Sequence, residues 1–183
     1  MKLIFNRKKK QGFTLIEILL VVGFIALAGI GIFVTYNTVV TGNAANTEGN
    51  NLNAIRAGTI NLFATAQTTA GLTNTVLNNA DVIPEPMRRP PGGIVNSFGG
   101  AVTVTPLTIT NPNDGFRITY AAVPGTVCTR LATGPGSQFN RVTVGTTVVK
   151  PFGVNTVVDI PAATVACAAD TGPGVTMHFD SLK

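Results

Sequence analysis

The sequence predicts an α+β protein in which a long amino-terminal α-helix, half of it membrane-embedded, packs on an antiparallel β-sheet head with one disulfide. Residues 18–34 are all apolar or glycine, and no charged residue follows Glu17 until Glu48. All eleven prolines lie between Pro84 and Pro173, which favours a long helix first and strands with turns afterwards. Both cysteines follow the apolar run.

The apolar run is long enough to cross a hydrocarbon core ~30 Å thick. Glu17 lies at the amino-terminal edge of this run. A carboxylate within a membrane span is unfavourable unless it is paired, and it usually has a functional role. We therefore divide the chain into a leader (1–12), a hydrophobic transmembrane and assembly helix (13–40), and a helix continuation with a globular head (41–183). The head has room for one core.

Apolar or threonine side chains recur at three- to four-residue spacing beyond the span: Leu52, Ile55, Thr59 and Phe63. This spacing predicts that the helix continues to about residue 70 with one face against the head. A helix over residues 13–70 would span ~87 Å, far more than a bilayer. Its proximal half therefore needs a second apolar environment, which the same helix of other subunits would supply.

The rest of the chain is expected to form short elements around a sheet. Residues 101–110 and 116–123 alternate apolar and polar side chains about the loop 111–115, which predicts a β-hairpin. The other expected elements are a short helix at 73–79, a turn-rich connector at 85–93, a helix at 126–132, a third strand at 139–149, and further strands at 154–160 and 175–179.

The run from residue 11 to 17, with the sequence QGFTLIE, follows a cluster of basic residues and enters the apolar stretch. A secretory signal peptide is cut at a small-residue site after its apolar core, whereas here the only plausible cleavage point, between Gly12 and Phe13, precedes it. This order resembles the leader of type IV prepilins. Cleavage there would remove the basic leader and keep the helix on the mature protein.

The resemblance to type IV prepilins implies a role for three residues. In that family a prepilin peptidase cuts after the glycine and methylates the new amino terminus, which implies processing at Gly12 and Phe13. The glutamate five residues into the mature chain neutralises the amine of a neighbouring subunit. By this resemblance Glu17 is the assembly residue.

The basic residues support the same division. The leader carries five of them, equal to the whole formal net charge of +5, so the remainder has 13 − 5 = 8 basic residues against 8 acidic ones. The sequence pI of about 9.6 therefore does not indicate a nucleic-acid-binding surface. Cations beside an apolar span hold that end in the cytoplasm and put the head in the periplasm.

Cys128 and Cys167 are both expected on the oxidising side of the membrane. The sequence has no Cys-x-x-Cys or histidine cluster, so we predict a disulfide between them in preference to free thiols or a metal site. Their surroundings, and the Asn-Ser-Phe-Gly-Gly run at 96–100, resemble type IVb pilins such as the toxin-coregulated pilin and bundlin. The short leader and the mature Phe13 are more usual in the type IVa class.

No catalytic residues, cofactor or metal are expected, since the single histidine, His178, lies in an expected strand and no nucleophile motif is present. The resemblance implies a structural subunit of a type IV pilus. Its partners would be like subunits in a homopolymer, the prepilin peptidase and the inner-membrane assembly platform. It would reside in the inner membrane as a precursor and in an extracellular pilus after assembly. Two alternatives stay open: a minor pilin or type II secretion pseudopilin, and a membrane-anchored periplasmic binding protein or enzyme.

Overall fold

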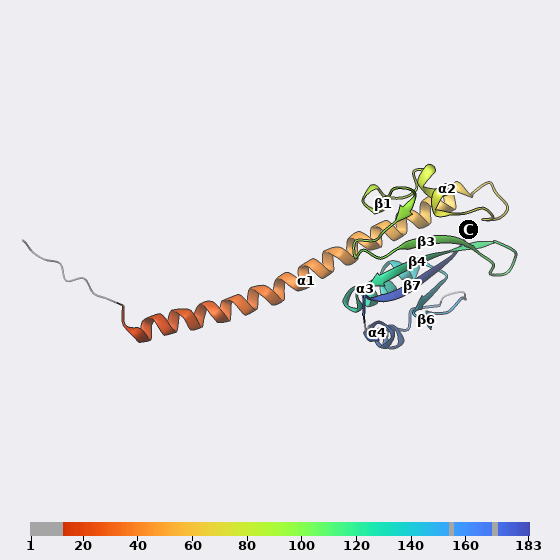
Figure 1. Cartoon of the computed structure of the whole chain (residues 1–183). Coiled ribbons are helices and arrows are strands. Elements are labelled where there is room, and N and C mark those ends of the chain that lie inside the picture. The colour runs from red at the N-terminus through yellow and green to blue at the C-terminus, as the bar shows by residue number, and fades with distance from the viewer. Residues whose placement is uncertain (1–12, 154–155, 170–171) are drawn as a thin grey trace, which may run out of the picture. The chain divides into compact units, whose positions relative to one another are not determined.

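The computed structural model describes residues 13–153, 156–169 and 172–183, and for residues 31–41 it gives the backbone alone. Contacts within the chain divide it into two units: the first ends at Val40, and the second, here called the head, is Thr41–Lys183. In Figure 1 the strands, and the helices that follow the long first helix, all belong to the head.

Helix α1 runs from Leu15 to Leu62, so the expected helix over residues 13–70 is too long. The chain leaves the helix because Thr69 is tied to the β-hairpin: its hydroxyl donates to Gly115 O at 2.6 Å and its backbone N donates to Asn113 O at 2.7 Å. Within the head, the prediction that one face of α1 packs against the head is confirmed. Leu52 and Ile55 of α1 are fully buried.

The segment between α1 and the sheet is compact. Helix α2 (Asn74–Asn79) forms where it was predicted, capped by the Thr73 hydroxyl, which accepts from Val76 N. The connector then contains a 3-10 turn (Glu85–Met87) and a small hairpin of two short strands, β1 (Arg88–Arg89) and β2 (Gly93–Ile94). The prediction of a turn-rich connector is therefore correct apart from this hairpin.

The main sheet has five antiparallel strands in the order β3-β4-β7-β5-β6. The predicted hairpin is confirmed as β3 (Val102–Leu107) and β4 (Gly115–Val123). The last strand, β7 (Val175–Leu182), lies in the centre between β4 and β5. One face of the sheet holds the core, with Phe116, Ile118 and Phe179 fully buried.

Two expected strands are wrong. Residues 139–149 do not form one strand but a hairpin of β5 (Arg141–Val144) and β6 (Thr147–Lys150), because Gly145 turns the chain with a φ of 57°. Helix α4 (Ile160–Ala168) begins at the end of the expected strand 154–160, and residues 156–159 have no regular structure. The Asp159 carboxylate caps this helix by accepting from Ala162 N, and alanine favours helix.

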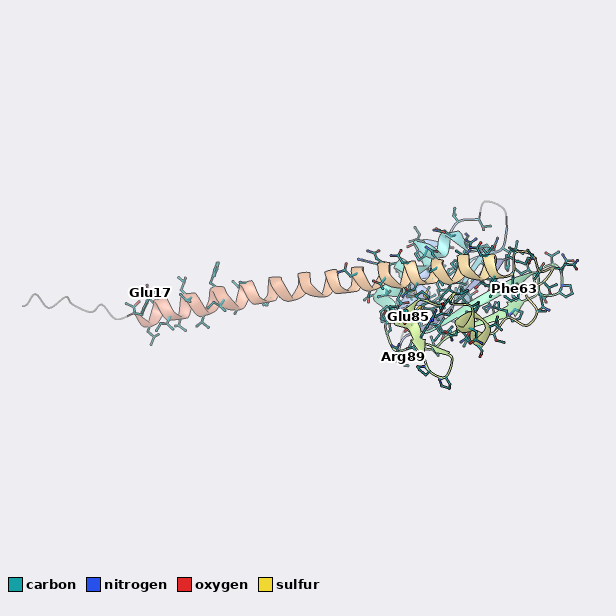
Figure 2. The ribbon with its side chains drawn as sticks, turned by 90° about the horizontal axis from the view of Figure 1, so that it is seen from above. Glu17, Phe63, Glu85 and Arg89 are labelled. Atoms are coloured by element: carbon teal, nitrogen blue, oxygen red, sulfur yellow. A yellow bond between two sulfur atoms is a disulfide. The ribbon has the colours of Figure 1, made fainter. Side chains whose placement is uncertain are left out.

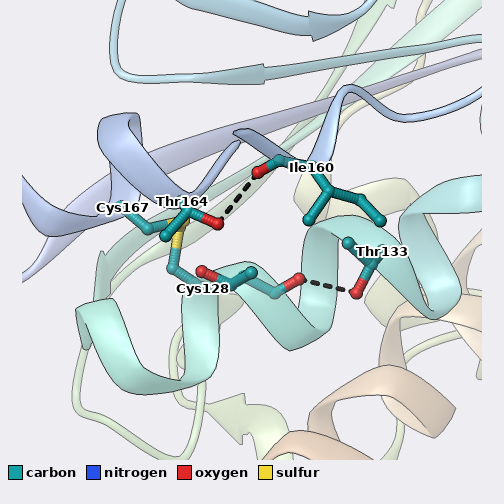
Figure 3. Close-up of a disulfide and its surroundings, with 6 residues drawn as sticks. Cys128, Thr133, Ile160, Thr164 and Cys167 are labelled. Carbon is teal, nitrogen blue, oxygen red and sulfur yellow. Dashed lines mark hydrogen bonds between the residues drawn. A yellow bond between two sulfur atoms is a disulfide. The ribbon is translucent and has the colours of Figure 1, made fainter. Parts of the chain in front are cut away.

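The predicted disulfide joins Cys128 of α3 (Gly125–Thr133) to Cys167 of α4, with a Cα–Cα distance of 5.7 Å. Figure 3 shows the two helices facing each other across the sulfur–sulfur bond. Both cysteines are buried. The bond fastens α4, whose other described large side chains, Ile160 and Val165, are exposed, to a helix with a buried apolar face.

The face of the sheet opposite the core carries a buried ion cluster. Asp180 of β7 is the direct cross-strand neighbour of Arg117 on β4 and of Arg141 on β5. Each arginine Nε donates to the carboxylate at 2.6 Å. The Asp180 side chain is fully buried, while Arg117 and Arg141 are 31% and 28% exposed. One carboxylate thus links three adjacent strands.

His178 lies two residues before Asp180 on the same face of β7. Its Nδ1 is 3.0 Å from the Thr119 hydroxyl oxygen. Burial lowers the pKa of His178, and the positive charge of Arg117 lowers it further, while Asp180 acts in the opposite direction. The folded head therefore favours neutral imidazole.

We expect loss of the disulfide to destabilise the head. Cys128→Ala should reduce the free energy of unfolding by roughly 4 kcal/mol, the chain-entropy value for a closed loop of this length. Denaturant titration of the full chain in detergent measures this. Cys167→Ala and the double variant should match the single variant, and reductant should lower the stability of the wild type alone. A double variant much less stable than either single variant would contradict a shared bond.

We expect acid to destabilise the head through His178. The pKa of His178 is lower in the folded head than in the unfolded chain. The neutral imidazole therefore contributes its full stability above the unfolded-state pKa. This contribution is lost as the pH falls from the unfolded-state pKa towards the folded-state pKa. Melting temperatures of the full chain between pH 8 and pH 5 measure the effect. His178→Gln should remove part of the fall in melting temperature below neutral pH. An unchanged pH profile in His178→Gln would contradict the assignment.

Candidate functional site

The residues predicted for processing and assembly lie at the start of α1. The Thr14 backbone oxygen accepts from Glu17 N at 3.1 Å and from Ile18 N at 3.2 Å, which closes the first turn. Glu17 lies in this turn, where the partial positive charge of a helix amino terminus favours a carboxylate. Gly12 lies outside the described residues.

Phe13 and Glu17 border the same shallow hollow on the helix surface, about 220 Å³ in volume, together with Ile18, Val21 and Val22. The structure therefore brings together two of the three residues predicted for processing and assembly. The two cysteines belong to the head and take no part in this hollow. The hollow is lined mainly by aliphatic side chains, with Glu17 as its single ionisable group.

The first unit exposes apolar side chains on every side of α1. Figure 2 shows side chains projecting all around the helix near Glu17. The exposed fraction lies between 50% and 79% for Phe13, Leu15, Ile16, Ile18, Leu19, Leu20, Val21, Val22, Phe24, Ile25, Leu27 and Ile30. A helix that is apolar all round is normally enclosed by protein or lipid. We therefore expect protein or lipid to enclose this segment.

Among the residues whose side chains the structure describes, no helix is both long enough and apolar enough to span a membrane.

The sequence did not single out Glu48, the first charged residue after Glu17, as a functional or structural residue. Glu48 is fully buried and accepts hydrogen bonds from the backbone N of Ser97, at 2.7 Å, and from the Ser97 hydroxyl. Burial raises the pKa of Tyr120 well above its ordinary value, and the nearby Glu48 carboxylate raises it further. Tyr120 therefore stays neutral beside the carboxylate.

The Asn-Ser-Phe-Gly-Gly run at 96–100 holds the partner of Glu48 in place. The Asn96 side chain accepts from Phe98 N at 3.0 Å and Gly100 N at 2.8 Å, and it donates to Ala121 O at 2.8 Å. A Cβ at Gly100 would lie 1.9 Å from Ala121 O, so glycine is required for this close approach. The run thus fastens α1 to the second strand of the hairpin.

No group of three or more histidine, cysteine, aspartate or glutamate side chains that could hold a metal ion occurs in the described part of the chain. His178 contacts Thr119 and lies beside the Asp180 cluster, so its surroundings are those of a structural imidazole. Asp159 is a helix cap and Asp180 is paired with two arginines. The exposed apolar residues at the start of α1 instead indicate a surface that binds other macromolecules.

The chain is similar in sequence to two curated proteins, each called the major structural subunit of bundle-forming pilus. They come from Escherichia coli O127:H6 (strain E2348/69 / EPEC) and Escherichia coli O111:H-. Each is 26% identical over 153 residues, which cover 83% of this chain and 74% of the relative.

Two solved structures share the fold. A type IVb pilin from Salmonella typhi matches with a TM-score of 0.56 and 24% identity, over 75% of this chain and 99% of that chain. TcpA, a type IV pilin from Vibrio cholerae El Tor biotype, matches with a TM-score of 0.58 and 13% identity, over 76% and 99%. The predicted resemblance to type IVb pilins is confirmed. The family model described as PilS N terminal matches residues 42–179, and this chain therefore belongs to the PilS family.

Proposed function

We propose that this chain is a structural subunit of a type IV pilus that polymerises through α1. The observation that carries the proposal is the exposed apolar surface from Phe13 to Ile30, together with the carboxylate of Glu17 in the first helical turn. Its likeness to the bundle-forming pilus subunits supports the same function.

The proposal extends to how the subunit reaches the filament. The chain is inserted in the inner membrane as a prepilin, with its basic leader in the cytoplasm and its head in the periplasm. A prepilin peptidase removes residues 1–12 and methylates Phe13, and an inner-membrane platform assembles the subunits. The motif at residues 11–17 and the apolar run at 18–34 support these steps.

Filaments sheared from cells that express the chain provide the test of the main proposal. Mass spectrometry of the sheared fraction should find this chain as the most abundant component. A trace amount would favour the minor pilin or pseudopilin alternative. Retention of the chain in the membrane with its leader attached would favour an anchored periplasmic protein.

Processing has its own expected outcome. Because Gly12 is the only small residue before the helix, the mature protein should begin at an N-methylated Phe13. Intact-mass measurement of the subunit checks this. Gly12→Val should leave the leader attached and abolish filaments while the precursor still enters the membrane. A mature chain that retains Met1, or that begins after residue 34, would contradict the proposal.

Glu17 should separate processing from assembly. Glu17→Gln keeps the size of the side chain but removes its charge, so the amine of the next subunit would be buried without a counter-ion. We expect normal insertion and cleavage but at least about a ten-fold loss of filaments. Glu17→Leu should behave alike, with partial rescue by co-expressed wild type. Immunoblots of membrane and sheared fractions measure both steps.

Glu85→Gln is the matched control, because Glu85 is an exposed carboxylate on the head whose side chain is 86% exposed. This variant should assemble normally. Figure 2 shows Glu17 at the start of α1 and Glu85 within the head. Normal filaments built from Glu17→Leu subunits alone would show that the carboxylate is not an assembly residue.

A further inference from the structure

The face of the main sheet opposite the core presents polar side chains on four neighbouring strands, β3, β4, β7 and β5. Beside the row that contains the Asp180 ion cluster runs a second row of direct cross-strand neighbours: Thr103, Thr119, His178 and Thr143. With neighbouring strands ~4.8 Å apart, this second row is ~14 Å long. We call six solvent-accessible side chains of the two rows the donor face: Arg117, Arg141, Thr103, Thr119, Thr143 and His178.

The donor face carries excess positive charge. Among the described residues, Asp180 is the only carboxylate paired with Arg117 or Arg141, so two guanidinium charges meet one negative charge. The other described carboxylates of the head are engaged elsewhere: Glu48 with Ser97, Asp81 and Glu85 with Arg88, and Asp114 and Asp159 with backbone N–H groups. A surface with excess charge of one sign attracts ligands of the opposite sign.

The donor face also has hydrogen-bonding groups that the head does not use. Arg117 and Arg141 each approach Asp180 through Nε and Nη2, at distances between 2.5 and 2.9 Å. The Nη1 groups of both arginines and the hydroxyls of Thr103 and Thr143 make no hydrogen bond with any residue that the structure describes. Neither Nη1 group is buried. These groups are therefore accessible to a ligand.

The two guanidinium groups are held in fixed orientations. Each makes a two-point contact with Asp180, and Arg141 also lies over the Phe152 ring, 4.6 Å from its centre. A guanidinium that is already fixed loses little side-chain entropy when it binds a ligand. Its planar donors match the two oxygens of a carboxylate. The sheet therefore presents a preformed pair of cations.

We propose that the donor face binds an acidic sugar, with the sugar carboxylate at Arg117 and Arg141 and the sugar hydroxyls along the row of threonines. Hydroxyl groups both donate and accept hydrogen bonds, so the threonines are complementary to a polyhydroxylated ligand. This binding goes beyond the proposed function, because the donor face contains no residue of α1.

Two other kinds of partner fit the donor face less well. Duplex DNA carries one negative charge per about 1.7 Å of its axis, whereas the donor face offers a single net positive charge. Protein interfaces depend on buried aromatic or apolar anchors. The two rows contain no aromatic or large aliphatic side chain. Hydroxyl groups beside one excess cation match a sugar acid better than either.

The first experiment uses the single histidine of the chain as a probe of the donor face. Glucuronate added at constant pH to the full chain in detergent should shift the His178 ring signals in NMR spectra until they saturate. Glucose, and sodium chloride at matched ionic strength, should give no saturating shift. An equal response to chloride, or none to glucuronate, would overturn the proposal. Tighter binding of a DNA oligonucleotide than of a glucuronate oligosaccharide of equal charge would overturn it in favour of a nucleic-acid site.

The second experiment measures glucuronate binding by variants. Arg141→Gln should raise the dissociation constant about ten-fold or more, because hydrogen bonds to charged groups are the stronger ones. Thr143→Val keeps a β-branched side chain and removes a hydroxyl that the head does not use, so it should fold normally and bind about three-fold more weakly. Arg130→Gln changes an exposed arginine on α3 and is the matched control. Unchanged affinity in Arg141→Gln or Thr143→Val, or an equal loss in Arg130→Gln, would overturn the proposal.

Discussion

The packing of the head on α1 depends on the contacts that the head makes with the two charged side chains of α1 after Glu17, which are Glu48 and Arg56. Glu48 accepts hydrogen bonds from Ser97, and Arg56 donates to the Ser181 hydroxyl at 3.2 Å while its guanidinium lies 5.5 Å from the Phe139 ring centre. Glu48 is fully buried, and a buried carboxylate is tolerated only with such partners. These contacts fix the rotation of α1 about its axis and leave its opposite face without charge.

The order of strands makes the end of the chain essential to the sheet. Strand β7 is last in sequence but central in space, and Asp180 within it pairs with arginines on both neighbouring strands. The hairpins β3-β4 and β5-β6 are local, but they meet only through β7. Long-range pairing of this kind is slow to form. The disulfide between α3 and α4 joins the segments that flank the second hairpin, and it restricts the conformations of this part of the unfolded chain.

Local patterns in the sequence were sufficient to predict α1, α2, α3, the first hairpin and β7. The failures have physical causes. Gly145 alone separates β5 from β6, and one glycine within an alternating run is a weak signal. Helix α4 is apolar on all sides, so it has no helical periodicity to detect. The pairing of Asp180 with Arg117 and Arg141 follows from strand order, which a single sequence does not contain.

The change in composition along α1 separates two kinds of contact. The apolar residues up to residue 34 are suited equally to lipid and to a packed helix bundle. Under the proposed function, a subunit can therefore leave the membrane and enter the filament while this segment keeps apolar surroundings. Amides are not suited to both, because an unpaired amide is strongly unfavourable in hydrocarbon. From Asn43 onwards α1 therefore buries one face in the head, with Leu52 and Ile55 fully buried, and its opposite, amide-rich face is not suited to hydrocarbon.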